Sequence, residues 1–180
     1  FISDETATYW YYAYRGWFWG DQVVWDANNH PLNSFIAFHL YNYFGDVPGI
    51  LRIGSLFSFL LFAFASYNFT GLLNGKRLQI LGFIAIISIP YMLEYFAYLR
   101  GYGLSMGFFM CSLWYLYKYA NTLKIFNLGL TYFLIFLSVS ANLTLLNSEL
   151  LIIGAVGLIH LIQFKSIGWQ KHLSAIVGTI

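Results

Sequence analysis

Charged residues are scarce in this chain. They make up 9% of its 180 residues, whereas 59% are hydrophobic and 22% are aromatic. Soluble globular domains carry about 25% charged residues. A soluble domain of this length could bury a good core, but it would still need a charged surface. The shortage of charge therefore excludes an ordinary soluble domain and indicates an integral membrane protein.

Cysteine is almost missing, and several sequence motifs are missing altogether. The single Cys111 has no partner for a disulfide within the chain. The sequence contains neither a glycine-rich phosphate loop nor a paired-cysteine metal motif. Its basic residues form no patch beyond a few lysine-bearing loops, so no nucleic-acid partner is expected. These absences exclude a cytosolic nucleotide-binding domain.

Long apolar runs are abundant instead. A helix needs about 20 apolar residues to cross the hydrocarbon core of a bilayer. Five runs are candidates: Ile50–Phe69, Leu78–Leu99, Gly103–Tyr119, Ile125–Leu146 and the shorter Leu150–Phe164. A further span is predicted to begin near Leu173, and the sequence stops inside it. We also expect the sequence to start just after a first span. The fold predicted for residues 50–180 is a polytopic bundle of transmembrane helices in an all-α membrane protein.

The charges divide between the two sides of these spans. Basic residues occupy the loops of one side, namely Lys76, Arg77, Lys118, Lys124, Lys165 and Lys171, and the acids Asp4, Glu5, Asp21, Asp26, Asp46 and Glu149 occupy the other. The positive-inside rule makes the basic side cytoplasmic. The protein is thus predicted to be a multi-pass membrane protein whose residues 1–49 are periplasmic or external in a bacterium, or lumenal in a eukaryote. Of these, we expect a bacterial inner or plasma membrane. Arg15, Arg52 and Arg100 break the pattern and are candidates for function.

Residues 1–49 are predicted to form an extracytoplasmic loop with two interfacial helices. The first covers Glu5 to Trp19 and consists largely of Trp, Tyr and Phe, and the second follows Pro31 and ends at Gly45. Trp and Tyr concentrate at the membrane–water boundary, where the ring is half buried and its polar tip stays wet. We therefore expect these helices to lie on the bilayer, either as a simple anchor or as a groove for a lipid substrate.

Three polar positions in this loop admit both chemical and structural readings. Asp4 and Glu5 sit where a carboxylate could act as a general base on a hydroxyl, or where it could simply cap a helix. His30 could bind a phosphate, relay a proton or ligate a metal, or be a hydrogen-bonded loop residue.

The two arginines near the spans are costly to place in a membrane. A charge within a span costs about 2.5–3.5 kcal/mol, so it usually faces a polar cavity or a partner. Arg52 either reaches the surface or pairs with Asp46. Arg100, in an Arg-Gly-Tyr-Gly sequence, either pairs with Glu94 or binds an anion. Together the two arginines could hold a phosphate or pyrophosphate.

These motifs together resemble a known family. The relevant segments are Asp4-Glu5, Asn28–Asn33, Phe44–Arg52 and Arg100–Ser105. In order and spacing they are similar to the GT-C glycosyltransferases, with the closest resemblance to the bacterial branch related to protein O-mannosyltransferases and the aminoarabinose transferase of lipid A. The resemblance implies a polytopic enzyme that uses polyprenyl-phosphate-linked sugars on the outer face of the membrane and transfers them, with inversion, to a hydroxyl of a lipid, glycan or protein acceptor.

The resemblance also implies roles for single residues. Asp4 becomes the base that deprotonates the acceptor hydroxyl, and Glu5 orients it or binds sugar. The residues predicted to bind substrate are Asp26, His30, Arg52, Glu94, Arg100 and Tyr102. Some relatives use a divalent metal, so such an ion is a candidate cofactor, although the sequence shows no dense ligand cluster. The first span and the C-terminal half of the family's pattern are absent from this sequence.

Two other classes remain open on the sequence. A transporter or flippase for a lipid-linked or anionic substrate would place its functional charges near the middle of the membrane, often beside broken helices. A non-catalytic subunit would have the shape of a transferase without its chemistry. A transferase would place its charges at the outer surface, which is where Asp4, Asp26, His30 and Arg100 are predicted to lie.

Overall fold

The structure is a computed structural model that describes residues 3–18, 21 and 30–167. Every regular element in this part of the chain is a helix, which confirms the all-α prediction for it. The elements are α1 (Ser3–Ala7), the π-helix η1 (Thr8–Tyr14), α2 (Pro31–Phe44), α3 (Pro48–Leu51), α4 (Ile53–Thr70), α5 (Lys76–Ile87), α6 (Pro90–Ala97), α7 (Gly101–Thr122), α8 (Ile125–Ala141), the 3₁₀-helix η2 (Leu143–Leu145) and α9 (Leu146–Ile167).

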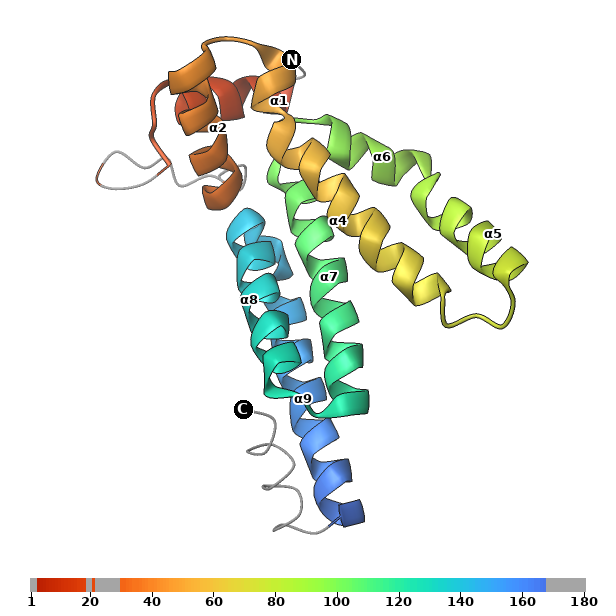
Figure 1. The fold of residues 1–180 in the computed structure, drawn as a ribbon. Coiled ribbons are helices and arrows are strands. Elements are labelled where there is room, and N and C mark those ends of the chain that lie inside the picture. The colour runs from red at the N-terminus through yellow and green to blue at the C-terminus, as the bar shows by residue number, and fades with distance from the viewer. Residues whose placement is uncertain (1–2, 19–20, 22–29, 168–180) are drawn as a thin grey trace.

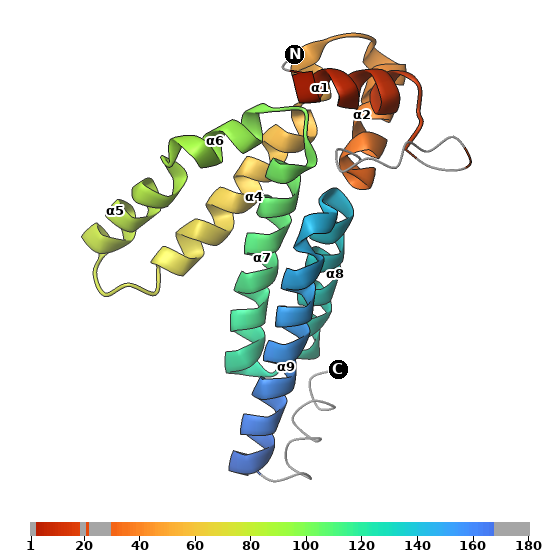
Figure 2. The same cartoon turned by 180° about the vertical axis from the view of Figure 1, so that it is seen from behind.

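Helix α7 is the centre of the arrangement. It packs against α4 on one side and α8 on the other, and α5 and α6 fold back along α4 (Figure 1). Helix α9 runs beside α7 and α8, as the reverse view shows (Figure 2). Elements α1, η1, α2 and α3 gather at one end, which we call the outer cap after the prediction that residues 1–49 are extracytoplasmic (Figure 1). The turns that precede Lys76 and Lys124 lie at the ends of α4 and α7 away from this cap.

Two described helical stretches are long and apolar enough to cross a membrane. They are α4, with 18 residues, and residues 143–162 of η2 and α9. Helices α5 and α6 would together make a third, but they are bent by 57° at the break before Pro90. Helix α8 is apolar but has only 17 residues. By length and composition, therefore, two helices could cross a membrane, or three if the bent pair is one span.

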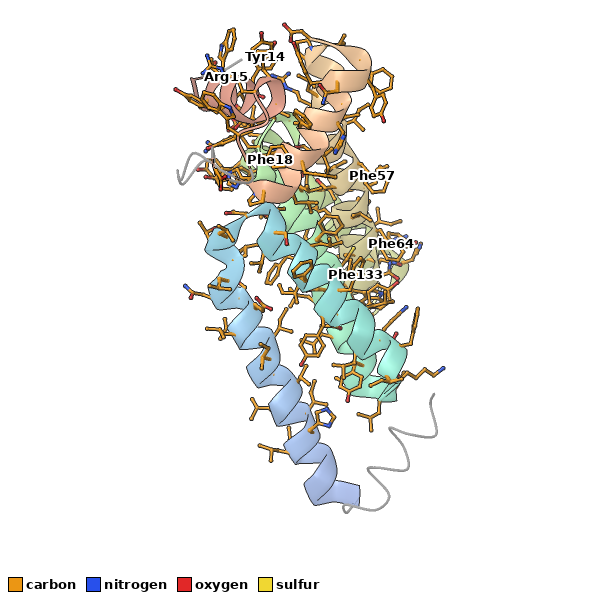
Figure 3. All side chains as sticks on the ribbon, turned by 90° about the vertical axis from the view of Figure 1, so that its left-hand side faces the viewer. Tyr14, Arg15, Phe18, Phe57, Phe64 and Phe133 are labelled. Atoms are coloured by element: carbon orange, nitrogen blue, oxygen red, sulfur yellow. The ribbon has the colours of Figure 1, made fainter. Side chains whose placement is uncertain are left out.

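Large apolar side chains project from the flanks of the long helices. Phe57 and Phe64 on α4 and Phe133 on α8 point away from the helix bundle (Figure 3), and all three are about half exposed. On α9, Leu151 and Leu158 are exposed as well. Soluble monomers rarely expose contiguous apolar faces of this kind, whereas such faces are what a bilayer covers.

Several predicted boundaries are corrected by local backbone chemistry. The run Ile50–Phe69 is divided at Arg52, which separates α3 from α4. The run Leu78–Leu99 bends before Pro90, because proline lacks the backbone N–H and disfavours helix in the residue before it. The run Ile125–Leu146 stops at Ala141, since Asn142 is extended and its side chain accepts a hydrogen bond from the Thr144 N–H.

The outer cap contains one confirmed helix and one that is shorter than predicted. Helix α2 begins at Pro31 and ends before Gly45, as predicted. The aromatic helix predicted to reach Trp19 ends at Tyr14. Gly16 lies in the left-handed region with φ +70°, where a Cβ would also come within 2.9 Å of the Phe38 ring. The span predicted near Leu173 lies outside the described residues.

Glycines let α7 approach its neighbours closely. A Cβ on Gly107 would lie 2.5 Å from the Ser58 carbonyl oxygen of α4, and a Cβ on Gly103 would lie 2.5 Å from the Tyr95 carbonyl oxygen of α6. Small residues spaced in this way allow helix backbones to pack tightly in membranes. Across the opposite interface the Ser138 hydroxyl of α8 donates a 2.8 Å hydrogen bond to the Ser105 carbonyl of α7.

The tightest of these contacts gives the first prediction. A Cβ on Gly101 would collide with the Ala141 carbonyl oxygen and approach the His30 Cβ to 2.7 Å. Gly101→Ala should therefore lower the free energy of unfolding by about 2 kcal/mol or more, because backbone must move to admit the methyl group. Thermal unfolding of the purified protein in detergent measures this. Gly129→Ala is the matched control, since nothing lies within 4 Å of its Cβ position, and equal melting of the two variants would contradict the packing.

Candidate functional site

A buried carboxylate joins the outer cap to the long helices. Glu5 of α1 accepts two hydrogen bonds from Arg52, from Nε to Oε1 at 3.1 Å and from Nη2 to Oε2 at 2.9 Å. Its Oε1 also accepts the backbone N–H of Leu99 at 2.6 Å. The Glu5 side chain is only 2% exposed, whereas that of Arg52 is 30% exposed. This geometry is a bidentate, charge-assisted arginine–carboxylate salt bridge.

The same contacts hold the segment between α6 and α7. Tyr98 and Arg100 are extended, so they leave backbone groups that no helix satisfies. The Leu99 N–H donates a hydrogen bond to Glu5, and the Arg100 carbonyl accepts a 3.2 Å hydrogen bond from the Ser55 hydroxyl of α4. The segment is thus held from both sides, and it presents Arg100 at the start of α7.

Tyr102 contacts two other predicted site residues, Arg100 and His30. The Arg100 Nη2 is 3.3 Å from the Tyr102 hydroxyl, and its guanidinium carbon is 4.6 Å from the centre of the Tyr102 ring. The His30 ring meets the Tyr102 ring edge-on, with centroids 5.0 Å apart. Arg100 also precedes the first residue of α7, a helix of 22 residues whose N-terminal end carries a partial positive charge. Guanidinium, hydroxyl and helix end together favour an anion.

His30 differs from its expected surroundings. It is 1% exposed, and neither ring nitrogen makes a hydrogen bond of standard geometry within the described chain, although the Ala141 carbonyl lies close enough to act on the ring. Burial and the nearby Arg100 charge lower the pKa of His30 to about 4, although the Ala141 carbonyl opposes the shift. At neutral pH the ring is therefore uncharged, and it packs edge-on against Tyr102.

Other predicted contacts are not formed. Arg52 pairs with Glu5 and not with Asp46, because the cap folds Glu5 onto the start of α4. Glu94 is exposed on α6 and forms no ion pair with Arg100. Asp26 lies outside the described residues, and Asp4 belongs to α1 but its side chain lies outside the described part. No group of three or more His, Cys, Asp or Glu side chains in the described part could hold a metal ion.

Sequence reasoning overlooked two polar residues of this region. Ser55, which fixes the Arg100 carbonyl, could have been found as a hydroxyl one turn after Arg52 in an otherwise apolar run. Asn33 is buried at the start of α2, and its amide nitrogen has no partner within the described chain. Nothing in its local sequence distinguishes it from an exposed helix residue.

An apolar cavity lies beside this cluster. It has a volume of about 530 Å³ and is lined by Phe18, Pro31, Leu32, Phe35 and Ser140. Pro31 directly follows His30, and Ser140 directly precedes Ala141, whose carbonyl faces Gly101. The apolar cavity thus lies between α2 and the end of α8, next in the chain to the residues that contact Gly101.

Comparison of the chain with protein-family models, with curated proteins and with solved structures gives no match. The resemblance to GT-C glycosyltransferases therefore stays a prediction that depends on the sequence motifs. Of the residues it selects, the structure brings Glu5 together with Arg52, and His30 together with Arg100 and Tyr102.

The Glu5 contacts give a second prediction. Glu5→Gln should lower the free energy of unfolding by about 2 kcal/mol, because it leaves the Arg52 guanidinium without its counter-charge; the loss is smaller than for a fully buried pair because Arg52 is 30% exposed. Chemical denaturation of the purified protein measures the change. Glu94→Gln removes an exposed carboxylate on α6 and should have little effect. If both variants unfold alike, the Glu5 pair does not support the fold.

His30 gives a prediction about pH. Because the pKa of its folded form is about 4 and that of free histidine is about 6.5, the unfolded chain binds the proton more readily. The stability that neutral His30 contributes is present above pH 6.5 and should be lost as the pH falls towards 4, by about 3 kcal/mol. The free energy of unfolding of wild type and of His30→Gln, measured between pH 7.5 and 4, shows how much of the pH dependence comes from His30. Identical pH slopes for the two proteins would contradict it.

Proposed function

We propose that this chain belongs to a polytopic membrane glycosyltransferase of the GT-C kind, which moves a sugar from a polyprenyl-phosphate donor to an acceptor hydroxyl on the outer side of a membrane. Arg100 is the observation that carries the proposal. A guanidinium beside a tyrosine hydroxyl, at the N-terminal end of a long helix and at the cap end of the molecule, suits the phosphate of such a donor.

The apolar cavity supports a lipid as the carrier of that phosphate. Its lining is aromatic and aliphatic apart from Ser140, and it lies next to the Arg100 cluster. An isoprenoid tail needs such a lining, whereas a nucleotide would need polar partners for its base and ribose. The exposed aromatic residues Trp10 and Tyr14 of the cap are of the kind that settles at a membrane–water boundary.

The proposed chemistry gives each of these groups a step. Asp4 takes the proton of the acceptor hydroxyl, and the oxygen of that hydroxyl attacks the anomeric carbon of the sugar. The new bond forms on the face opposite the phosphate, so the configuration inverts, and the bond between the anomeric carbon and the phosphate oxygen breaks. Arg100 stabilises the negative charge that grows on the leaving polyprenyl phosphate. Glu5 acts through Arg52 and Leu99 by fixing the helix that bears Asp4 relative to Arg100.

One observation favours a second candidate, a transporter or flippase. The bend of 57° between α5 and α6 resembles the broken helices of transporters. However, Glu5, Arg52 and Arg100 gather at the cap end of the described bundle, away from its middle. A transporter would leave polyprenyl-phosphate sugars intact, so the reaction product separates the two candidates.

Release of free polyprenyl phosphate in membranes that contain the protein tests the proposal. Wild type should release it only when an acceptor is present. Asp4→Asn should slow release at least about 100-fold through loss of the base, and Arg100→Gln should slow it about 100- to 1000-fold through loss of the charge facing the phosphate.

Asp21→Asn is the matched control, because Asp21 is a second acid before Pro31, is exposed and has no assigned role. Equal turnover in wild type and Asp4→Asn would remove Asp4 from catalysis. Folded wild-type protein that releases no polyprenyl phosphate from any lipid-linked sugar would favour the transporter or a non-catalytic subunit.

A further inference from the structure

A second cavity opens on the outer cap, on the aromatic helix. It has a volume of about 340 Å³ and is lined by Thr6, Ala7, Trp10, Tyr11 and Arg15. All five residues belong to α1, to η1 or to the residue that ends η1. The apolar cavity beside Arg100 shares none of them. This cavity therefore needs an explanation of its own.

The lining residues lie along one face of a helix. Thr6 lies four residues before Trp10, and Ala7 lies four residues before Tyr11. Arg15 follows Tyr11 by four more residues, and side chains at this spacing are neighbours on a helix surface. Part of this face belongs to the π-helix η1, a rare type of segment that is frequent at functional sites. The helix thus places two aromatic rings and one guanidinium on a single face.

The walls of the cavity are held by ring contacts. The Trp10 ring meets the Tyr14 ring edge-on at 5.4 Å, and the Tyr11 ring stacks on the Trp17 ring with centroids 6.2 Å apart. Arg15 lies over the same Trp17 ring, with its guanidinium carbon 4.6 Å from the ring centre. The arginine is thereby oriented by an aromatic face, and it forms no ion pair with any described carboxylate.

The cavity lies at the cap end of the molecule. Tyr14 and Arg15 are found there, whereas Phe57, Phe64 and Phe133 project from the helices below (Figure 3). Trp10 is 48% exposed and Tyr11 is 41% exposed. The cavity wall is therefore open to a ligand from outside the protein.

Aromatic walls and one arginine define a class of ligand. The C–H faces of a pyranose ring are apolar and pack on aromatic rings, while its hydroxyl edges stay in water. A guanidinium adds selectivity for a carboxylate or phosphate on that ring. We propose that this cavity binds a single sugar ring that carries a carboxylate or a phosphate group. The binding itself is independent of the transferase proposal, whereas a role as the acceptor subsite rests on it.

An anionic membrane surface fits the cavity less well. Recognition of anionic lipids ordinarily uses clusters of four to eight lysines and arginines. Arg15 is the only lysine or arginine before Arg52, and the same stretch holds five carboxylates. A surface with that balance of charge is repelled by an anionic bilayer, but one arginine can still select one acidic sugar.

Saturation-transfer NMR on the protein in nanodiscs of neutral phosphatidylcholine tests the proposal. The probes are glucuronate, glucose 6-phosphate and neutral glucose. Wild type should bind the two acidic sugars about tenfold more tightly than glucose, as one charge-assisted contact allows. Arg15→Gln should remove this preference, and Trp10→Ala or Tyr11→Leu should weaken all three sugars about tenfold or more.

Two controls remove similar side chains elsewhere. Arg77→Gln takes away an exposed arginine at the opposite end, and Tyr43→Ala takes away a cap aromatic that is 79% exposed and does not line the cavity. Both should bind like wild type. Equal affinity for glucuronate in wild type and Arg15→Gln overturns the proposal. So does binding of anionic phospholipid that displaces the sugars and depends on Arg15, since that marks a headgroup site.

The same variants in the polyprenyl phosphate release assay separate the two proposals. If the sugars bind as expected but no acceptor supports release, the cavity is an anionic-sugar site in a protein that is not a transferase. If release depends on Asp4 and Arg100 but is unaffected by Arg15→Gln with an acidic acceptor, the transferase proposal stands and the acceptor role of this cavity is overturned.

Discussion

The Glu5 carboxylate is the interaction on which the rest of the structure depends. It is buried, and a buried carboxylate is tolerable only when its oxygens are fully engaged. Arg52 and the Leu99 N–H provide that engagement from two different parts of the chain. One side chain therefore ties the outer cap to the start of α4 and to the segment before α7.

Close helix packing extends this constraint into the bundle. Gly101 and Gly107 bring α7 against the end of α8 and against α4, so the helix that begins after Arg100 has little freedom to shift. Arg100 is thus held by its carbonyl, by the helix that follows it and by the ring of Tyr102. Preorganised charge of this kind is what an enzyme needs where a leaving group becomes anionic. The neutral His30 packed behind Tyr102 supports that position without adding charge.

Local features of the structure were predictable from the sequence, and long-range ones were not. Helix α2 follows from Pro31 and Gly45, and the pairing of Arg100 with Tyr102 joins residues two apart. The Glu5–Arg52 pair joins residues 47 apart. The hydropathy pattern of the sequence does not show which carboxylate Arg52 pairs with, so the pair could not be predicted from it. The π-helix that begins at Thr8 could not be predicted, because a run made almost wholly of aromatic residues shows no hydrophobic periodicity. The break at Asn142 was missed because a local cap interrupts an otherwise continuous apolar run.

The end of the molecule that bears the outer cap thus combines the start of α7 with Arg100, an apolar cavity and an aromatic helix. The central claim is that Arg100 receives the phosphate of a lipid-linked sugar there. A cryo-electron microscopy structure of the protein with a bound polyprenyl phosphate tests it most directly. The account predicts phosphate density in contact with the Arg100 guanidinium and tail density in the cavity beside Phe35. Phosphate density at the opposite end of the bundle, beside Lys118 and Lys124, would contradict it.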